Sequence, residues 1–230
     1  MRSLAASLLF VALAGCAPAH IRALGIDHVI LGAPNLADGS AEFEQLTGVK
    51  PVYGGQHPDR GTENALASLG NGSYVEIIAP RADVAPAGEL AELRKLTKLT
   101  PIGWALHVDD IKEARTVLKR GGFTTTEPRP GSRVTPDMFK LQWTTFGIAK
   151  PQIDTAPFFI RWSEPVDHPS LNAPQGCGLR EIRIEDPHES VLHKLMWTLG
   201  LPGVRTRQAD KPQLWFQLVC RKGEVVFPTE

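Results

Sequence analysis

The stretch IDHVILGAPN, residues 26–35, begins a pattern that the chain repeats. Its apolar run, bounded by glycine and proline, predicts a β-strand over residues 26–31. Asn35 then predicts the N-cap of a helix over residues 37–46, which Gly48 ends. Short apolar segments predict the three strands that follow, at residues 52–53, 62–69 and 74–79. Residues 26–35 therefore open one β-α-β-β-β unit.

The same order of elements returns twice. After a helix at residues 88–99, the second unit has a strand at 102–108, a helix from its cap at Asp109 or Asp110 to Leu118, and strands at 123–126, 139–146 and 157–162. The third unit has a strand at 179–184, a helix at 187–199 capped by Asp186, and strands at 204–208, 214–220 and 224–227. Each unit buries one sheet face against its helix, so the other faces line a cavity. We expect an α+β fold in which β-α-β-β-β modules form a cup, with a third module at the C-terminal end.

The charge balance excludes some classes of partner. The 230 residues contain 25 Lys plus Arg and 25 Asp plus Glu, so the formal net charge is zero. Nucleic acids and anionic membrane surfaces both require a basic excess, and neither is expected as a partner. The sequence also lacks a phosphate-binding glycine loop, a Gly-x-Ser-x-Gly elbow and a His-Glu-x-x-His motif. A small-molecule ligand is the partner that remains, and the oligomeric state stays open.

The N-terminal segment predicts export. Arg2 precedes an apolar run at residues 4–13, which is shorter than the roughly 20 residues of a membrane-spanning helix. The run ends in LAGC, residues 13–16, which resembles the lipobox of bacterial lipoproteins and implies a signal peptide at 1–15 with lipidation at Cys16. The next residue, alanine, favours the outer membrane facing the periplasm. The small-x-small pattern at residues 17–19 leaves soluble export to the periplasm as the alternative.

Two cysteines remain in the mature chain. An oxidising compartment would allow Cys177 and Cys220 to form a disulfide. Of the two states we favour separate buried thiols. Neither cysteine has metal-ligand spacing or an obvious histidine partner.

Alternation along the strands selects the residues that face the cup. Val29 and Leu31 should pack on the helix, which leaves His28 on the cup side with Ile30. On the fourth strand Glu76 shares a face with its neighbours two residues away, Tyr74 and Ile78. His28 and Glu76 would serve as metal ligands or as an acid–base pair. The alternative is a structural His–Glu hydrogen bond or two solvated side chains.

Several further polar residues are candidates for substrate binding. His57 and Arg60 lie in a predicted turn at the cup rim, where arginine offers a fixed fork of donors to an anion or a carbonyl. Thr62 and Asn64 follow on one face of the next strand. The alternative is a structural role, in which these polar side chains only stabilise the conformation of the loop. Arg161 is either a ligand contact or an outward-facing residue. Tryptophans 104, 143 and 162 are expected in the core, and histidines 188 and 193 in solvent.

These motifs together resemble a known family. The segments DHV (27–29), QHPDRGTENAL (56–66) and YVEII (74–78) are similar to the glyoxalase-like branch of the vicinal oxygen chelate superfamily. WAL (104–106), DI (110–111), PFFIRW (157–162) and GLREI (178–182) extend the resemblance over most of the mature chain. It implies a linker at residues 16–24, a domain of two paired modules at 25–165 and a third unit at 166–230.

The resemblance also implies a divalent metal held between the two modules. The first module offers His28 and Glu76, whereas aligning the helix starts and last strands places Gly103 and Ile160 at the matching positions of the second. His107 lies further along the face of Gly103, near the cavity mouth. The possible metal site therefore consists of two protein ligands with waters, or of these two ligands with His107. The alternative is that the protein binds no cofactor.

The function expected from the resemblance is an enzyme acting on a small oxygenated or carbonyl-containing molecule. The superfamily includes lyases, isomerases and dioxygenases, and resemblance does not choose among them. A lipoprotein that binds or sequesters a small molecule without chemistry is the alternative.

Overall fold

The first unit folds as the sequence predicts. The computed structural model describes residues 25–85, 89–164, 167–201 and 203–229. The unit consists of β1 (Ile26–Gly32), α1 (Leu36–Thr47), β2 (Val52–His57), β3 (Thr62–Gly70) and β4 (Ser73–Pro80). Asn35 caps α1 by accepting a hydrogen bond from the backbone N–H of Asp38 at 2.8 Å, and Gly48 ends the helix in the left-handed conformation.

The second unit departs from the prediction at one strand, and the helix predicted at residues 88–99 before it is shorter than expected, Glu89–Leu93. The segment predicted at 123–126 forms only a short strand that pairs outside the barrel, and RPGSRV, residues 129–134, takes its place. Proline and glycine are rare in strand interiors, so this segment carries no strand signal. The elements are α2 (Glu89–Leu93), β5 (Thr100–His107), α3 (Ile111–Arg120), β6 (Thr124–Thr125), β7 (Arg129–Val134), β8 (Lys140–Phe146), β9 (Ile148–Lys150) and β10 (Phe158–Trp162).

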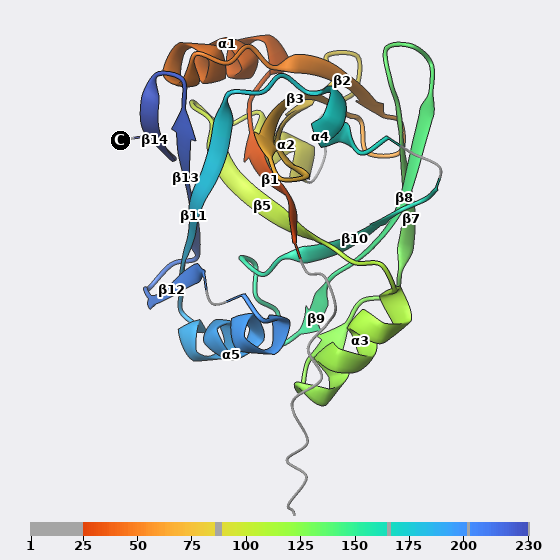
Figure 1. Ribbon diagram of the computed structural model, residues 1–230, viewed down its shortest axis with the longest axis vertical. Helices are drawn as coiled ribbons and strands as arrows, with labels where there is room; N and C mark the ends of the chain where they lie inside the picture. The colour runs from red at the N-terminus through yellow and green to blue at the C-terminus, as the bar shows by residue number, and fades with distance from the viewer. Residues whose placement is uncertain (1–24, 86–88, 165–166, 202, 230) are drawn as a thin grey trace, which may run out of the picture.

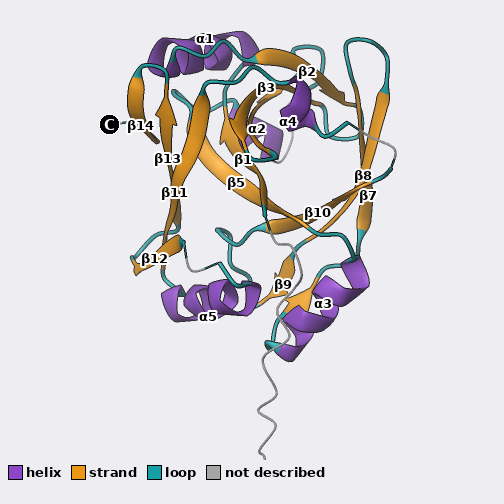
Figure 2. Ribbon diagram, viewed as in Figure 1, coloured by secondary structure: helices purple, strands orange, loops and turns teal. Residues whose placement is uncertain are grey.

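Eight strands of these two units close into a barrel in the order β1-β4-β3-β2-β7-β8-β10-β5. Figure 2 shows these strands wrapping around a common centre. One seam is the antiparallel pair β1–β5, and the other is the short contact of β2 with β7, where Gln56 lies opposite Val134. Within each unit the first and last strands run parallel, β1 with β4 and β5 with β10. The barrel is therefore two paired modules, as the predicted cup requires.

The third unit forms its own sheet beside the barrel (Figure 1). It follows α4 (Pro169–Asn172) and consists of β11 (Cys177–Asp186), α5 (Glu189–Leu199), β12 (Val204–Gln208), β13 (Gln213–Cys220) and β14 (Gly223–Phe227), in the sheet order β12-β11-β13-β14. Phe227 stacks on Phe43 of α1 with ring centroids 6.0 Å apart, so the third unit shares the core of the first. His188 and His193 are exposed at α5, as predicted. These observations confirm the α+β fold of repeated modules.

The prediction of two separate thiols is wrong. Cys177 and Cys220 form a disulfide, with their Cα atoms 4.0 Å apart. The two residues lie directly opposite each other where β11 pairs with β13, and the spacing of the two cysteines in the sequence gives no sign of that register. The disulfide ties the start of β11 to the end of β13.

Export and membrane anchoring are predicted from the first 20 residues. The predicted signal peptide and Cys16 lie outside the described residues. Within the described ranges, no helix has the length and apolar character needed to cross a bilayer.

Candidate functional site

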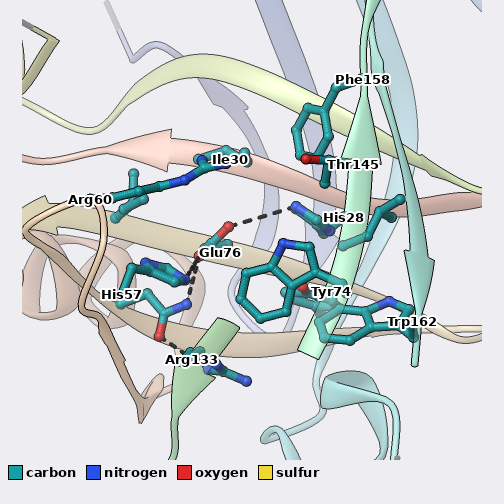
Figure 3. A pocket seen from close by; sticks show the side chains of 14 residues that line it. His28, Ile30, His57, Arg60, Tyr74, Glu76, Arg133, Thr145, Phe158 and Trp162 are labelled. Atoms are coloured by element: carbon teal, nitrogen blue, oxygen red, sulfur yellow. Dashed lines mark hydrogen bonds and ion pairs between the residues drawn. The ribbon is translucent and has the colours of Figure 1, made fainter. Parts of the chain in front are cut away.

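The barrel encloses a cavity of about 50 Å³ (Figure 3). Alternation along β1 works as predicted, since Val29 and Leu31 are buried in the core while His28 lines the cavity. A cavity of this size takes a small molecule or the head group of a larger one. The side chains that line it come from every barrel strand except β5 and from the β2–β3 turn: His28, Ile30, His57, Arg60, Asn64, Tyr74, Glu76, Ile78, Arg133, Trp143, Thr145, Phe158, Ile160 and Trp162.

Glu76 lies at the centre of the polar side chains. Asn64 Nδ2 donates a hydrogen bond to its Oε1 at 2.6 Å, and His57 Nε2 lies 3.7 Å from the same oxygen. His28 Nε2 lies 3.6 Å from Oε2. Burial raises the pKa of Glu76, but His57, His28, the Asn64 hydrogen bond and Arg133 outweigh it and leave the pKa below its usual value. Glu76 is thus a buried carboxylate that stays ionised at neutral pH.

His28 is held in one orientation by Asp27. The Nδ1 atom of His28 lies 2.6 Å from Oδ1 of Asp27, which is 1% exposed. A carboxylate only accepts, so Nδ1 carries a proton and donates it to Asp27, while Nε2 faces Glu76. The ring stacks on Tyr74 with centroids 4.8 Å apart and meets the edge of Phe158 at 5.5 Å. The arrangement leaves Nε2 as the ring nitrogen of His28 that faces Glu76 in the cavity.

Asp27 also gathers three more donors. Trp162 Nε1 donates to Oδ2 at 2.9 Å, His168 Nε2 lies 3.2 Å from this oxygen, and His107 Nδ1 lies 3.5 Å from it. Burial raises the pKa of Asp27, yet hydrogen bonds from the three histidines hold it far below its usual range. Asp27 is therefore a permanent carboxylate that fixes the His28 tautomer.

His57 is a neutral neighbour of this pair. Its Nδ1 lies 3.0 Å from Oγ1 of Thr62, and its ring meets the edge of Trp143 with centroids 5.9 Å apart. Burial lowers the pKa of His57, and the positive charges of Arg133 and Arg60 add to that effect against the pull of Glu76. The imidazole contributes polarity to the cavity without adding a charge.

The structure brings most of the predicted residues together. His28, His57, Arg60, Asn64 and Glu76 all line the cavity. The remaining predicted residues lie elsewhere: Thr62 supports His57, His107 contacts Asp27 and Asp109, and Arg161 lies outside the cavity.

Arg161 points outward because its neighbour Ile160 takes the inward position on β10. The guanidinium of Arg161 is exposed and donates from Nε to the carbonyl of Asp109 at 2.9 Å. Of the tryptophans, Trp104 is fully buried as predicted, whereas Trp143 and Trp162 also line the cavity.

The expected match of Gly103 with His28 conflicts with the expected match of Ile160 with Glu76, because the strand register cannot satisfy both. Ala105 lies opposite His28 across β1–β5, and Ala105 pairs with Phe158 as His28 pairs with Tyr74. If Ile160 matches Glu76, Ala105 takes the place of His28 in the second module.

The lengths of the two units explain why aligning the helix starts and aligning the last strands give different matches. The step from His28 to the start of α1 at Leu36 is two residues longer than the step from Ala105 to the start of α3 at Ile111. Aligning the helix starts therefore shifts the strands. On the match of Ala105 with His28, Ile160 lies two residues past Phe158 as Glu76 lies two residues past Tyr74.

The donor set does not fit a metal held between the modules. The second module places alanine and isoleucine where the first places His28 and Glu76, and neither side chain ligates. One oxygen of Glu76 already accepts from Asn64. Over the described ranges, no group of three or more His, Cys, Asp or Glu side chains is arranged around a common metal position.

Three functional residues escape prediction from the sequence. Asp27 stands out only as part of the DHV segment, because nothing in the pattern shows that three histidines converge on it. His168 lies in the connection between the second and third units, where no periodicity exists. Arg133 lies on β7, the strand that the sequence does not predict.

The comparisons agree with the fold and the residue pattern. A family model described as a glyoxalase-like domain matches residues 26–200. No curated protein matches the sequence.

Solved structures are similar at low identity. A hypothetical protein from Staphylococcus aureus is 18% identical with a TM-score of 0.65, and the match covers 83% of this chain and 88% of that chain. Methylmalonyl-CoA epimerase from Mycobacterium tuberculosis is 16% identical with a TM-score of 0.46, over 65% of this chain and 94% of that chain. At 18% identity the similarity to the Staphylococcus aureus protein shows the fold alone.

Proposed function

Because the chain belongs to the glyoxalase-like domain family, we propose that it is an enzyme that moves a proton on a small carbonyl-bearing molecule in the barrel cavity. The observation that carries the proposal is the arrangement of Asp27, His28 and Glu76. Asp27 fixes the proton of His28 on Nδ1, and the free Nε2 faces the cavity beside Glu76. This is the geometry of a general base, held by groups that do not themselves react.

The chemistry follows from the charges around His28. Nε2 takes a proton from the carbon next to the carbonyl, the C–H electron pair forms the C–C double bond of an enolate, and the carbonyl oxygen gains the negative charge. Glu76, 3.6 Å from Nε2, stabilises the imidazolium that results. Arg60 and Arg133 line the same cavity, so their positive charge favours the enolate oxygen. Return of the proton to either face, or to the neighbouring carbon, makes the reaction an epimerisation or an isomerisation.

Deuterium exchange tests this function even while the natural substrate is unidentified. The protein is incubated in D₂O with small carbonyl compounds such as pyruvate, pyruvamide, glycolaldehyde and dihydroxyacetone, and NMR follows loss of the C–H signal. We expect exchange of at least one compound, slowed about 10²- to 10⁴-fold by His28→Ala. His193→Ala, an exposed histidine of α5, is the control and should keep the wild-type rate.

Exchange at the buffer rate for every compound, or an unchanged rate in His28→Ala, would overturn the proposal. Binding of a compound without exchange would favour the non-catalytic binder.

We propose further that the protein works in the bacterial cell envelope, lipid-anchored through Cys16. The Cys177–Cys220 disulfide supports an oxidising compartment, since such bonds are rare in a reducing cytosol. Labelling with radioactive palmitate should mark the wild-type protein and leave Cys16→Ser unlabelled. Release of unlabelled wild-type protein into the soluble periplasmic fraction would instead favour soluble export.

A further inference from the structure

Arg133 is a buried cation without an anionic partner. Its exposed fraction is 3%, and its one hydrogen bond to a side chain runs from Nη1 to the neutral amide oxygen of Asn64 at 3.1 Å. Among the described residues, no carboxylate lies within ion-pair distance of its guanidinium. Burial lowers the pKa of Arg133, which reflects the cost of keeping this charge away from water. Arginine is rarely buried unless an anion accompanies it.

The neighbouring strand makes room for this side chain. A Cβ atom on Gly54 would lie 2.2 Å from Nη1 of Arg133 and 2.4 Å from Oδ1 of Asn64. At Gly55, where φ is +130°, a Cβ would lie 2.0 Å from the carbonyl oxygen of Val134. Two consecutive glycines therefore let β2 and β7 approach and let the guanidinium lie between the strand and the cavity.

The charged side chains of the cavity leave one positive charge uncompensated. Arg133 and Glu76 are buried and carry opposite charges, the exposed Arg60 adds a second positive charge at the cavity rim, and the lowered pKa of His57 keeps that ring neutral. A ligand with a single negative charge would balance the cavity. Figure 3 shows His28 to the right of Glu76 and Arg133 below it, so the two side chains approach Glu76 from different directions.

We propose that Arg133 binds the carboxylate of the substrate, which is a small monocarboxylate with a carbonyl next to its reacting carbon. The inference rests on the proposed function, because it places the reacting carbon toward His28. The guanidinium offers parallel N–H donors that match the two oxygens of a carboxylate. A cavity of about 50 Å³ has room for such a head group.

Anion binding is measured apart from catalysis. Thermal shift and tryptophan fluorescence follow titration with formate, acetate, glyoxylate and pyruvate, against sodium chloride of equal ionic strength, and Trp143 and Trp162 in the cavity wall report occupancy. We expect carboxylates to bind and the neutral pyruvamide and methyl pyruvate not to. Arg133→Gln should weaken pyruvate binding about 10- to 100-fold. Arg129→Gln, an exposed arginine of the same strand, is the control and should bind as wild type.

The outcomes separate this inference from the proposed function. His28→Ala should keep carboxylate binding while it loses deuterium exchange. If no carboxylate binds better than chloride, or if pyruvamide binds wild type as tightly as pyruvate, Arg133 is not a carboxylate site, whatever the exchange experiment gives. Because the wild-type comparison of charged and neutral ligands needs no variant, misfolding of Arg133→Gln would not hide the answer. Arg133→Lys keeps the charge but not the fork, and should bind pyruvate with an affinity between those of wild type and Arg133→Gln.

Discussion

Asp27 determines which nitrogen of His28 can act as a base. Its carboxylate accepts the Nδ1 proton at 2.6 Å, and Trp162, His107 and His168 hold it in place. Asp27 does not line the cavity, so it acts on the reaction only by positioning His28.

Asp27→Asn should slow deuterium exchange about 10²- to 10⁴-fold while pyruvate binding stays near wild type. An amide can donate to Nδ1, which would favour the tautomer whose proton is on Nε2 and leave no base in the cavity. Exchange kinetics and carboxylate titration measure the two effects separately. Equal losses of binding and exchange would indicate a general loss of structure and contradict the positioning role.

His107 should make the stability of the fold depend on pH. Hydrogen bonding to Asp27 raises the pKa of His107, burial opposes this, and Asp109 adds to the increase. A folded-state pKa above the unfolded value of about 6.5 stabilises the fold fully below that pH, and the contribution is lost as pH rises through the folded pKa. His107→Gln should therefore lower the melting temperature more at pH 6 than at pH 9. Equal losses at both pH values would contradict the charged pairing.

The sequence is most informative about residues on strands with clear alternation. His28 and Glu76 can be placed on the cavity face because their strands have apolar neighbours at regular spacing. Arg133 cannot, since RPGSRV has no such pattern and its burial depends on two glycines of another strand. Convergence of His107 and His168 on Asp27 joins residues 80 and 141 positions away, which only the folded chain reveals.

At the scale of elements, the two barrel modules have the same topology but different chemistry. When Ile160 is matched to Glu76, the register of β5 with β10 places Ala105 where His28 stands in the first module. The second module instead contributes apolar walls and Arg133. Helix caps and turns let the sequence predict most strands and helices, but β7 and the disulfide depend on pairings between distant segments.

The disulfide gives a stability prediction for the third unit. It closes a sequence separation of 43 residues, for which chain entropy in the unfolded state implies a contribution of about 4 kcal/mol. Cys177→Ser should lower the free energy of unfolding in urea by about this amount. Wild type unfolded with a reducing agent should match the variant, and a variant as stable as the oxidised wild type would show that the bond does not form.

At the scale of the whole molecule, a closed barrel surrounds a small cavity with one reactive end. Among the described residues, the histidine and carboxylate side chains that face this cavity all come from the first module. We therefore expect a base and an anion site instead of a metal held between modules.

Metal analysis tests whether the cavity holds a metal ion or a base and an anion site. Protein purified without a chelator should contain substoichiometric zinc, iron, manganese and nickel, and EDTA should leave its melting temperature unchanged. Stoichiometric metal that is lost in both His28→Ala and Glu76→Ala would contradict the proposed base and support a metalloenzyme.

The most direct test of the proposed base is the tautomer of His28, measured by long-range ¹H–¹⁵N NMR of the histidine side chains, with the signal assigned by its absence in His28→Ala. We predict a neutral His28 with its proton on Nδ1 and an unprotonated Nε2 in the wild-type protein. In Asp27→Asn the proton should move to Nε2. A wild-type His28 that carries its proton on Nε2 would leave no base in the cavity and contradict the proposed function.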